Sequence, residues 1–439
     1  MQHTFSIEQA LKNLDIEQLN AMQLASLEAS KTGKDFILLA NTGSGKTLAF
    51  LLPVVQSLDK TNKTTQALII VPSRELALQI EQVYRSLGTG MKVTCCYGGH
   101  KREIEEQNLL EAPVLIIGTP GRLADHIRRG NIQTASIETL VLDEFDKSLE
   151  LGFQDEMSFV IGSLTGLKKR ILTSATEAVE VPAFIGLTDA DKLNFLTGDP
   201  PAMLAIQQVK SKGEEKEVTL FRLICALGNR SMVIFCNHRE IVEQVSAMLS
   251  DKGIVNVFYH GAMEQRDREV ALCKFRNGTS NVLVTTDLAA RGLDIPNIRY
   301  IIHYQFPGTE EIFIHRNGRT ARMDASGTAI MMLSAMETLP PYLDPATEEI
   351  ILPETTEIPD KPKWTTLFID AGKKDKVNKI DIVGFLTQKG EMKKDDIGLI
   401  EVKDFFSFAA VRKSKASTML HAIKGHKIKN KRVAIHIAK

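Results

Sequence analysis

The sequence predicts an α/β protein with two tandem parallel-sheet domains, followed by a small α+β domain at the C-terminal end. Short apolar runs rich in β-branched residues alternate with amphipathic segments between residues 35 and 175. The same alternation restarts between residues 231 and 333, and a proline-rich stretch then precedes a basic tail. The length of 439 residues fits this division, since a domain takes ~150 residues on average.

The first domain is expected to span residues 1–203. Its strand candidates are residues 35–40, 66–71, 114–118, 138–143 and 169–175. The segments between them, such as SRELALQIEQVYRSL, carry apolar residues at helical spacing. Strands that alternate with helices indicate a parallel sheet covered on both faces.

The second domain is expected to span residues 204–338. The polar and weakly periodic residues 200–217 are interpreted as the linker that leads into it. Its strand candidates are residues 231–236, 255–260, 281–287, 298–306 and 327–333.

A second linker is predicted over residues 339–363, which hold six of the fifteen prolines. Proline at that density neither continues a helix nor joins a central strand. The third domain is expected to span residues 364–439. Its strand candidates are residues 365–372, 397–411 and 431–438, and its helix candidates are residues 379–390 and 416–425.

Bulk properties argue against a membrane or secreted protein. No apolar run reaches the ~18 residues that a transmembrane helix needs. The first residues, MQHTFSIEQALKNLD, lack the basic start and apolar stretch of a signal peptide. The five cysteines form no CxxC pair, which favours packed thiols in reduced surroundings over disulfides or zinc. We therefore expect a cytoplasmic protein that is not associated with a membrane.

Charge is divided unevenly along the chain, although the formal net charge is zero. Residues 364–439 hold 17 Lys+Arg and 8 Asp+Glu, a net charge of +9, which leaves −9 for the rest. A basic module on an acidic body suggests a polyanionic partner. The alternative is a charged face that contacts only solvent.

A phosphate-binding loop is predicted in DFILLANTGSGKT, residues 35–47, where a strand runs through a glycine-bearing loop into a helix. Glycine permits the backbone torsions that aim several N–H groups at phosphate oxygens. The lysine adds a positive charge, and the threonine hydroxyl can bind Mg²⁺. The expected nucleotide ligands are Thr42, Gly43, Ser44, Gly45, Lys46 and Thr47.

A group of acids follows the strand candidate LVL, in the sequence LVLDEFD. Ligands of such folds collect at the carboxyl ends of the parallel strands. We expect Asp143 to hold Mg²⁺ together with Thr47, and Glu144 to accept a proton from the attacking water. The alternative is an acidic strand end that caps the next helix.

Further motifs follow in order: SRELA, the glycine pair 98–99, TPGR (119–122), SAT (174–176), TTDLAARGLD (285–294) and HRNGRTAR (315–322). Between about residue 6 and residue 335 the chain resembles the DEAD-box RNA helicase family. The resemblance implies two tandem RecA-like domains, ATP and Mg²⁺ as cofactors, and RNA as the partner of a monomeric core. ATP and RNA would each bridge the two domains and favour a closed state.

The resemblance also implies roles for single residues in nucleotide turnover. Gln23 would contact adenine and Asp294 the ribose, and Arg319 and Arg322 would be arginine fingers at the γ-phosphate. The alternative for these arginines is surface ion pairing. The residues implied to couple hydrolysis to RNA binding are Asp146, Ser174, Thr176 and His315.

The implied RNA contacts are backbone amides, hydroxyls and arginines, which suit a sugar–phosphate chain rather than base edges. They are Pro72, Ser73, Arg74, Gly99, Thr119, Gly121 and Arg122 in the first domain, and Thr286 and Gly292 in the second.

The chain departs from the family pattern at several positions near the nucleotide, and two of these departures matter most here. Phe145 replaces the alanine that gives the family its name, and we expect altered packing with hydrolysis retained. The family's upstream aromatic, which stacks on adenine, has no counterpart at the usual spacing, since Phe5 lies only 18 residues before Gln23.

The basic tail resembles the C-terminal RNA-binding domain of the DbpA group of bacterial DEAD-box proteins, chiefly in GKKDK followed by KIDIVGFL. The resemblance implies a small RRM-like fold that binds structured ribosomal RNA. Phe405, Phe406 and Phe408 either stack on bases or, for most of them, belong to the core. The phosphate contacts expected from charge are Lys373, Lys374, Lys376, Arg412, Lys413, Lys415, Lys429, Lys431 and Arg432.

We therefore expect an ATP-dependent RNA helicase that remodels ribosomal RNA during large-subunit assembly. A runner-up is an ATP-gated RNA clamp with little unwinding activity. A DNA helicase is a third alternative, and stimulation of its ATPase by single-stranded DNA as strongly as by RNA would identify it.

Overall fold

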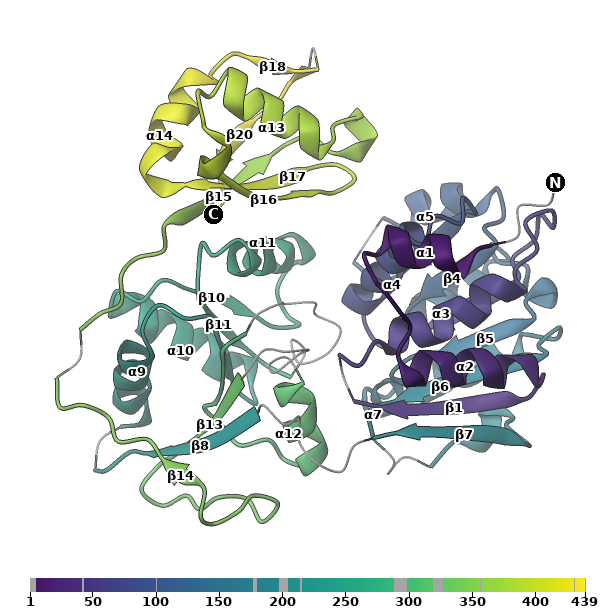
Figure 1. Ribbon diagram of the computed structural model, residues 1–439, viewed down its shortest axis with the longest axis horizontal. Helices are drawn as coiled ribbons and strands as arrows, with labels where there is room; N and C mark the ends of the chain where they lie inside the picture. Colours follow the sequence, from purple (N-terminus) through teal and green to yellow (C-terminus); the bar gives the residue numbers. More distant parts are fainter. Residues whose placement is uncertain are drawn as a thin grey trace. The chain divides into compact units, whose positions relative to one another are not determined.

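The computed structural model describes residues 5–41, 43–99, 101–176, 180–196, 204–213, 215–287, 298–318, 327–355, 357–429 and 431–438 (Figure 1). The described chain divides into two compact units, one ending at residue 196 and the other starting at residue 204. Each unit is described by itself.

The first unit is built on a seven-stranded sheet with the order β3-β4-β2-β5-β6-β1-β7, in which all neighbours are parallel. The sheet confirms the expected fold class. The two strands that we did not predict, β3 and β7, lie at its edges. The strands are β1 (Asp35–Ala40), β2 (Ala67–Ile70), β3 (Val93–Cys96), β4 (Leu115–Gly118), β5 (Thr139–Leu142), β6 (Lys169–Ser174) and β7 (Ala190–Phe195).

Helices cover both faces of this sheet. Successive strand residues point to opposite faces, so Ile69 and Leu68 belong to different buried clusters. Helices α1 to α4 pack on the face of Ile69, and α6 to α8 on the face of Leu68. The helices are α1 (Ile7–Asn13), α2 (Ala21–Lys31), α3 (Lys46–Ser57), α4 (Arg74–Ser86), α5 (Arg102–Leu109), α6 (Pro120–Arg128), α7 (Phe145–Glu150) and α8 (Gln154–Gly162), with 3₁₀ turns η1 (Thr134–Ser136) and η2 (Ala183–Ile185).

The second unit begins with another seven-stranded parallel sheet, of order β10-β11-β9-β12-β13-β8-β14. Its strands are β8 (Leu204–Lys210), β9 (Met232–Phe235), β10 (Asn256–Tyr259), β11 (Val282–Thr285), β12 (Tyr300–His303), β13 (Gly327–Leu333) and β14 (Glu348–Glu349). The helices are α9 (Lys216–Leu227), α10 (Arg239–Asp251), α11 (Gln265–Arg276) and α12 (Glu310–Asn317).

The interpretation of residues 200–217 as a linker was wrong. Residues 204–210 form β8, which pairs with β13 along its whole length, from Leu204 opposite Gly327 to Lys210 opposite Leu333. Only two residues of this strand are buried, and its polar residues gave no apolar run that would have predicted a strand. Within the predicted linker 339–363, β14 adds a short edge strand beside β8.

The C-terminal part of the second unit is a four-stranded antiparallel sheet, of order β16-β17-β15-β20, with two helices. The residues 397–411, predicted as one strand, form two strands joined by a turn in which Lys403 N donates to Phe406 O at 2.8 Å. The elements are β15 (Trp364–Ile369), η3 (Lys373–Asp375), α13 (Lys379–Gln388), η4 (Lys394–Asp396), β16 (Ile397–Val402), β17 (Ser407–Arg412), α14 (Lys413–Ala422), β18 (Lys427–Ile428), β19 (Lys431–Arg432) and β20 (Ile435–Ile437).

Within the second unit, one face of this antiparallel sheet packs against α11. Phe368 and Phe408 are buried in one cluster with Val270 and Cys273 of that helix. A bidentate ion pair lies beside the cluster, with Arg276 Nε and Nη2 at 2.8 and 2.9 Å from the two carboxylate oxygens of Glu401. The aromatic residues of this face therefore contribute to a core.

In the described part of the chain, we find no helix whose length and apolar character would let it cross a membrane.

Candidate functional site

The phosphate loop lies between β1 and α3, as predicted. Gly43 and Gly45 have φ of 81° and 93°, in the left-handed region where a side chain is strained. Lys46 is the first residue of α3, and its buried Nζ donates to the carbonyl oxygen of Ala40 at 2.5 Å. The loop therefore wraps around the lysine side chain. Thr42 lies outside the described residues.

The start of α2 rests against this loop. Asn20 caps α2, and its side-chain amide donates to the carbonyl of Ser44 at 3.0 Å. Gln23 Nε2 lies 3.4 Å from the carbonyl oxygen of Gly45. A Cβ added at Gly45 would lie only 2.7 Å from that nitrogen. The expected adenine-reading residue and the phosphate loop are thus in direct contact.

The two acids expected to act on the nucleotide follow β5. Asp143 is buried, and its Oδ1 accepts a hydrogen bond from Thr173 Oγ1 of β6. Burial and the neighbouring Glu144 carboxylate raise the pKa of Asp143 to about 7, while the Thr173 hydroxyl and Lys46 act in the opposite direction. Two carboxylates so close in a buried place favour a cation beside them.

Glu144 has a strained backbone, with φ 49° and ψ 50°. Non-glycine residues adopt this left-handed conformation at a cost of ~1–3 kcal/mol, mostly where function requires it. The side-chain oxygen Oε2 is shielded from solvent, yet it has no hydrogen-bond partner within the described ranges. An acceptor held in this way fits the proposed role toward a water molecule.

The next residues begin α7. Phe145 is buried in the apolar cluster between the sheet and α8, and the expected packing change with retained hydrolysis stays a prediction. Burial, followed by repulsion from Glu144, raises the pKa of the Asp146 carboxyl to about 6. At the end of β6, Ser174 Oγ donates to the carbonyl oxygen of Thr176 at 2.8 Å and accepts from its N–H at 3.0 Å.

The sheet order explains how these residues meet. Strands β5, β6 and β1 are consecutive neighbours, so the DEFD segment, the SAT segment and the phosphate loop all leave the same edge side by side. The donor set suits the nucleotide and metal implied by the sequence: glycine amides and Lys46 for phosphates, and Thr47 with Asp143 for Mg²⁺.

The predicted RNA contacts of the first unit lie along the same edge, after β2, β3 and β4. Ser73 caps α4 by accepting from Leu76 N at 3.2 Å. The Arg74 guanidinium lies 4.7 Å from the centre of the Tyr97 ring, and its Nη1 is 3.5 Å from the carbonyl oxygen of Gly99. Thr119 precedes α6, and Pro120 is the first residue of that helix.

Sequence reasoning missed a buried carboxylate that touches these loops. Glu105 of α5 contacts Arg122 and His126 of α6, and it accepts from the backbone N–H of Tyr97. The partners are separated by up to 21 residues, as for His126. No motif or periodicity marks such a pair, so only the folded structure could identify it.

In the second unit, Thr286 follows β11, and its carbonyl accepts from the Thr285 hydroxyl at 3.1 Å. His315 is buried in α12. The predicted residues Gly292, Asp294, Arg319 and Arg322 lie outside the described residues.

A second residue that the sequence analysis missed is Arg316, which is fully buried. Its Nε lies 2.5 Å from Asp287 Oδ1, and its other nitrogens donate to Gln305 O at 2.9 Å and Asn237 Oδ1 at 2.8 Å. One guanidinium therefore joins the loops after β9, β11 and β12. Thr286 immediately precedes Asp287, so the contact between Arg316 and Asp287 also restrains the backbone at Thr286.

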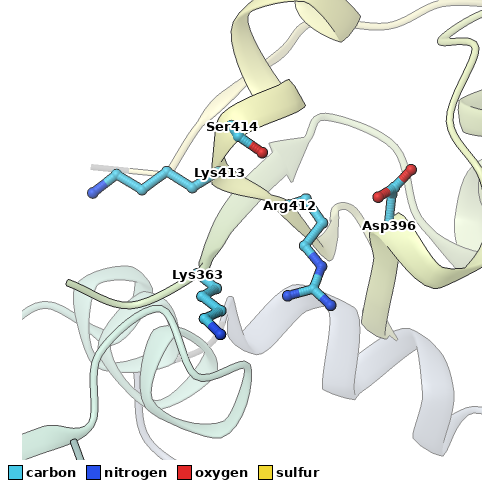
Figure 2. Close-up of a pocket in the computed structure, with 5 residues that line it drawn as sticks. All are labelled: Lys363, Asp396, Arg412, Lys413 and Ser414. Atoms are coloured by element: carbon cyan, nitrogen blue, oxygen red, sulfur yellow. The ribbon is translucent and has the colours of Figure 1, made fainter. Parts of the chain in front are cut away.

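The C-terminal sheet carries a basic pocket of about 600 Å³, lined by Lys363, Asp396, Arg412, Lys413 and Ser414 (Figure 2). The Arg412 guanidinium lies 4.4 Å from the centre of the Trp364 ring. The single carboxylate, Asp396, already pairs with Lys415 at 2.6 Å. Arg412 and Lys413, both predicted to contact phosphates, line this pocket.

Other basic residues of the tail are divided between ion pairs and solvent. Lys429 pairs with Asp381 at 2.9 Å, and Lys431 pairs with Asp375. Lys373, Lys374 and Lys376 are exposed beside the turn between β16 and β17, where Lys373 N and Lys374 N donate to the carbonyls of 403 and 404. Phe408 belongs to the core, as expected, whereas Phe405 is 48% exposed.

Three family models match consecutive parts of the chain. The DEAD/DEAH box helicase model matches residues 20–183, the helicase conserved C-terminal domain matches residues 215–324, and the DbpA RNA binding domain matches residues 366–437.

Similar proteins cover nearly the whole chain. It is 35% identical to the ATP-dependent RNA helicase DbpA of Escherichia coli (strain K12), over 98% of this chain and 96% of that protein. It is 29% identical to the protein of the same name from Bacillus subtilis (strain 168), over 100% of this chain and 98% of that one.

Solved structures resemble the two parallel-sheet domains. Dbp5 of S. cerevisiae bound to RNA and ADP BeF3 matches with a TM-score of 0.67 and 25% identity, over 75% of this chain and 88% of that chain. Mss116p bound to ssRNA and AMP-PNP matches with a TM-score of 0.69 and 25% identity, over 79% and 77%.

Proposed function

Because the chain belongs to the DEAD/DEAH-box family of ATP-dependent RNA helicases and ends in a DbpA RNA-binding domain, we propose that it remodels structured RNA, specifically ribosomal RNA during large-subunit assembly. We also propose that the protein is located in the cytoplasm. The RNA would be held by the core through its backbone and selected by the C-terminal domain.

The observation that carries the proposal is the arrangement of the first sheet. The phosphate loop and its acids follow β1, β5 and β6, whereas the predicted RNA loops follow β2, β3 and β4. Since β2 and β5 are neighbours, the two groups of loops leave the sheet at adjacent strand ends. This adjacency suits an enzyme in which RNA and nucleotide influence each other.

We assign the residues as follows. Glycine amides of the loop and Lys46 bind the phosphates of ATP, and Thr47 with Asp143 hold Mg²⁺, which supplies charge neutralisation at the phosphates. Glu144 accepts the proton of the attacking water. Gln23 contacts adenine, and Asp294, Arg319 and Arg322 keep their proposed roles at the ribose and the γ-phosphate.

The ribosomal target is supported by the charge and the pocket of the tail. The domain from residue 364 has a net charge of +9. Arg412 and Lys413 line a single pocket, and Lys373 and Lys374 are exposed. Basic side chains of this kind suit the phosphates of a folded RNA. Stacking of RNA bases on the sheet is less suited to this domain, because Phe368 and Phe408 of the sheet are buried.

The test is ATP turnover by the full chain with no RNA, with generic single-stranded RNA and with total ribosomal RNA. We expect stimulation by both RNAs and half-saturation at a lower concentration of ribosomal RNA. Arg412→Gln with Lys413→Gln should remove that preference and keep the generic stimulation. Lys389→Gln, an exposed lysine of the same domain, is the control.

A strand-displacement assay on a short tailed duplex would separate an unwinding enzyme from a clamp. Absence of RNA stimulation in the wild-type chain would contradict the proposed activity. Equal affinity for both RNAs would contradict only the ribosomal target.

A further inference from the structure

We propose that Glu105 is a positioning residue for RNA binding, which fixes the Gly98–Gly99 turn relative to the first turn of α6. His126 in turn holds the carboxylate of Glu105 in place. This inference rests on the proposed function, because it assigns RNA contacts to those two segments.

Glu105 is 1% exposed, and its carboxylate contacts Tyr97, His126 and Arg122. Its Oε1 accepts from the backbone N–H of Tyr97 at 3.1 Å. Its Oε2 lies 2.8 Å from His126 Nε2 and 3.2 Å from Arg122 Nη1. One buried side chain of α5 therefore joins the residue after β3 to the first and last turns of α6. The positions of Tyr97, Arg122 and His126 are linked through this one carboxylate.

His126 is fully buried, and its second ring nitrogen is also engaged. The side-chain amide nitrogen of Asn131 lies 3.0 Å from His126 Nδ1. An amide nitrogen can only donate, so Nδ1 accepts and Nε2 carries the proton that is donated to Glu105. The direction of each hydrogen bond along Asn131, His126 and Glu105 is thus set.

The segments joined by Glu105 suit an anion. Gly99 has φ 77°, and no side chain caps the N-terminus of α6. Arg122 keeps 15% side-chain exposure while it touches Glu105. A buried ion pair adds little to stability compared with an apolar substitute of the same size. Stability alone therefore does not explain a buried carboxylate at this position, whereas the placement of Arg122 and of the glycine turn does.

A metal site is the competing interpretation, since the ligand atoms of Cys96, Glu105 and His126 all lie within 4.8 Å of one another. Both oxygens of Glu105 already accept from protein donors. Burial, and then the charge of Glu105, raise the pKa of the Cys96 thiol, whereas a soft metal requires the thiolate. The hydrogen-bonded arrangement therefore favours positioning.

The experiment compares Glu105→Gln, His126→Ala and His126→Gln in the full chain, with Glu103→Gln on the exposed side of the same helix as control. The readouts are the RNA concentration that half-saturates ATPase stimulation, kcat at saturating RNA and the melting temperature. We expect Glu105→Gln and His126→Ala to raise the half-saturating RNA concentration about tenfold, the effect of losing one hydrogen bond to a charged group. His126→Gln keeps an amide donor and should stay within about twofold of wild type.

Three results would overturn the inference. One is an equal loss in His126→Gln and His126→Ala. Another is a lowered melting temperature in the variants with unchanged half-saturating RNA. The third is stoichiometric bound metal in the purified chain, which would support the metal site instead. If Glu105→Gln does not fold, the two His126 variants decide. If RNA does not stimulate ATP turnover by the wild-type chain, the proposed function itself is contradicted. This result can be distinguished from the other three.

Discussion

Thr173 of β6 donates its hydroxyl hydrogen to Asp143, the residue that follows β5, and accepts a hydrogen bond from the backbone N–H of Glu144 at 3.2 Å. A single hydroxyl thereby orients both acids of the proposed nucleotide site. It also opposes the increase in the pKa of Asp143 that burial causes.

Replacing Thr173 with valine should lower RNA-stimulated kcat by about 10- to 100-fold, because a buried carboxylate loses a hydrogen-bond donor worth ~1.5–3 kcal/mol. Thr173→Ser retains the hydroxyl and should keep most of the activity. Steady-state ATP turnover at saturating RNA measures both. Equal activity of the valine and serine variants would show that the hydroxyl is not needed.

Asp146→Asn should stabilise the protein at neutral pH while lowering its RNA-stimulated activity. The pKa of Asp146 is raised in the folded state to about 6, from an ordinary value of 3.8. The folded chain therefore binds this proton more tightly than the unfolded chain. Its contribution to stability is complete below pH ~4 and is lost as the pH rises through about 6.

The loss amounts to roughly 3 kcal/mol at most for a shift of this size. The melting temperature of Asp146→Asn should exceed that of wild type at pH 8, and the difference should vanish near pH 4. Asp155→Asn, at an exposed site of α8, is the control. A difference that does not change with pH would contradict the assignment.

Gly45→Ala should raise the KM for ATP by at least about tenfold. The new methyl group would lie 2.7 Å from Gln23 Nε2, on a backbone with φ 93°, and an L-residue is strained there by ~1–2 kcal/mol. Gly130→Ala is the matched control, since its φ of 73° carries similar strain and no atom lies within 4 Å of the new Cβ. Both variants should lose thermal stability, but only Gly45→Ala should bind ATP weakly.

Arg276→Met should destabilise the second unit by about 1–3 kcal/mol, because the partly buried Glu401 loses its bidentate partner. The double variant Arg276→Met with Glu401→Leu should recover most of this loss, since apolar residues can replace both members of a buried pair. Hydrogen exchange of β15 and β17 measures the change locally. Additive losses in the double variant would show that the two side chains are not coupled.

The central parts of the fold could be predicted from the sequence because fully buried parallel strands are continuous apolar runs. DFILLA, QALIIV and ETLVLD each mark a strand that has neighbours on both sides. The strands β3 and β7 were missed because an edge strand needs no such run, and β7 reads ADKLNF. The polar LAIQQVK of β8 concealed a paired strand for a similar reason.

The candidate site divides in the same way. Residues of the phosphate loop and of DEFD could be predicted because their chemistry is concentrated in short segments. The partners that hold those segments could not be predicted, since Thr173 lies 30 residues from Asp143 and Arg316 lies 29 residues from Asp287. Contacts of this kind depend on which strands become neighbours, and no local pattern encodes that.

Phe145 has a wider consequence. Its ring fills space in the same buried cluster as Met157 and Leu142, whereas Asp143, Glu144 and Asp146 beside it are residues that we propose to act at the nucleotide or in its coupling to RNA. On that proposal, chemistry constrains three positions of the tetrapeptide, and side-chain volume constrains the fourth. On the same proposal, an exchange at that position needs only a compensating change of side-chain volume nearby, so a sequence pattern that requires all four letters would miss proteins with the same proposed site.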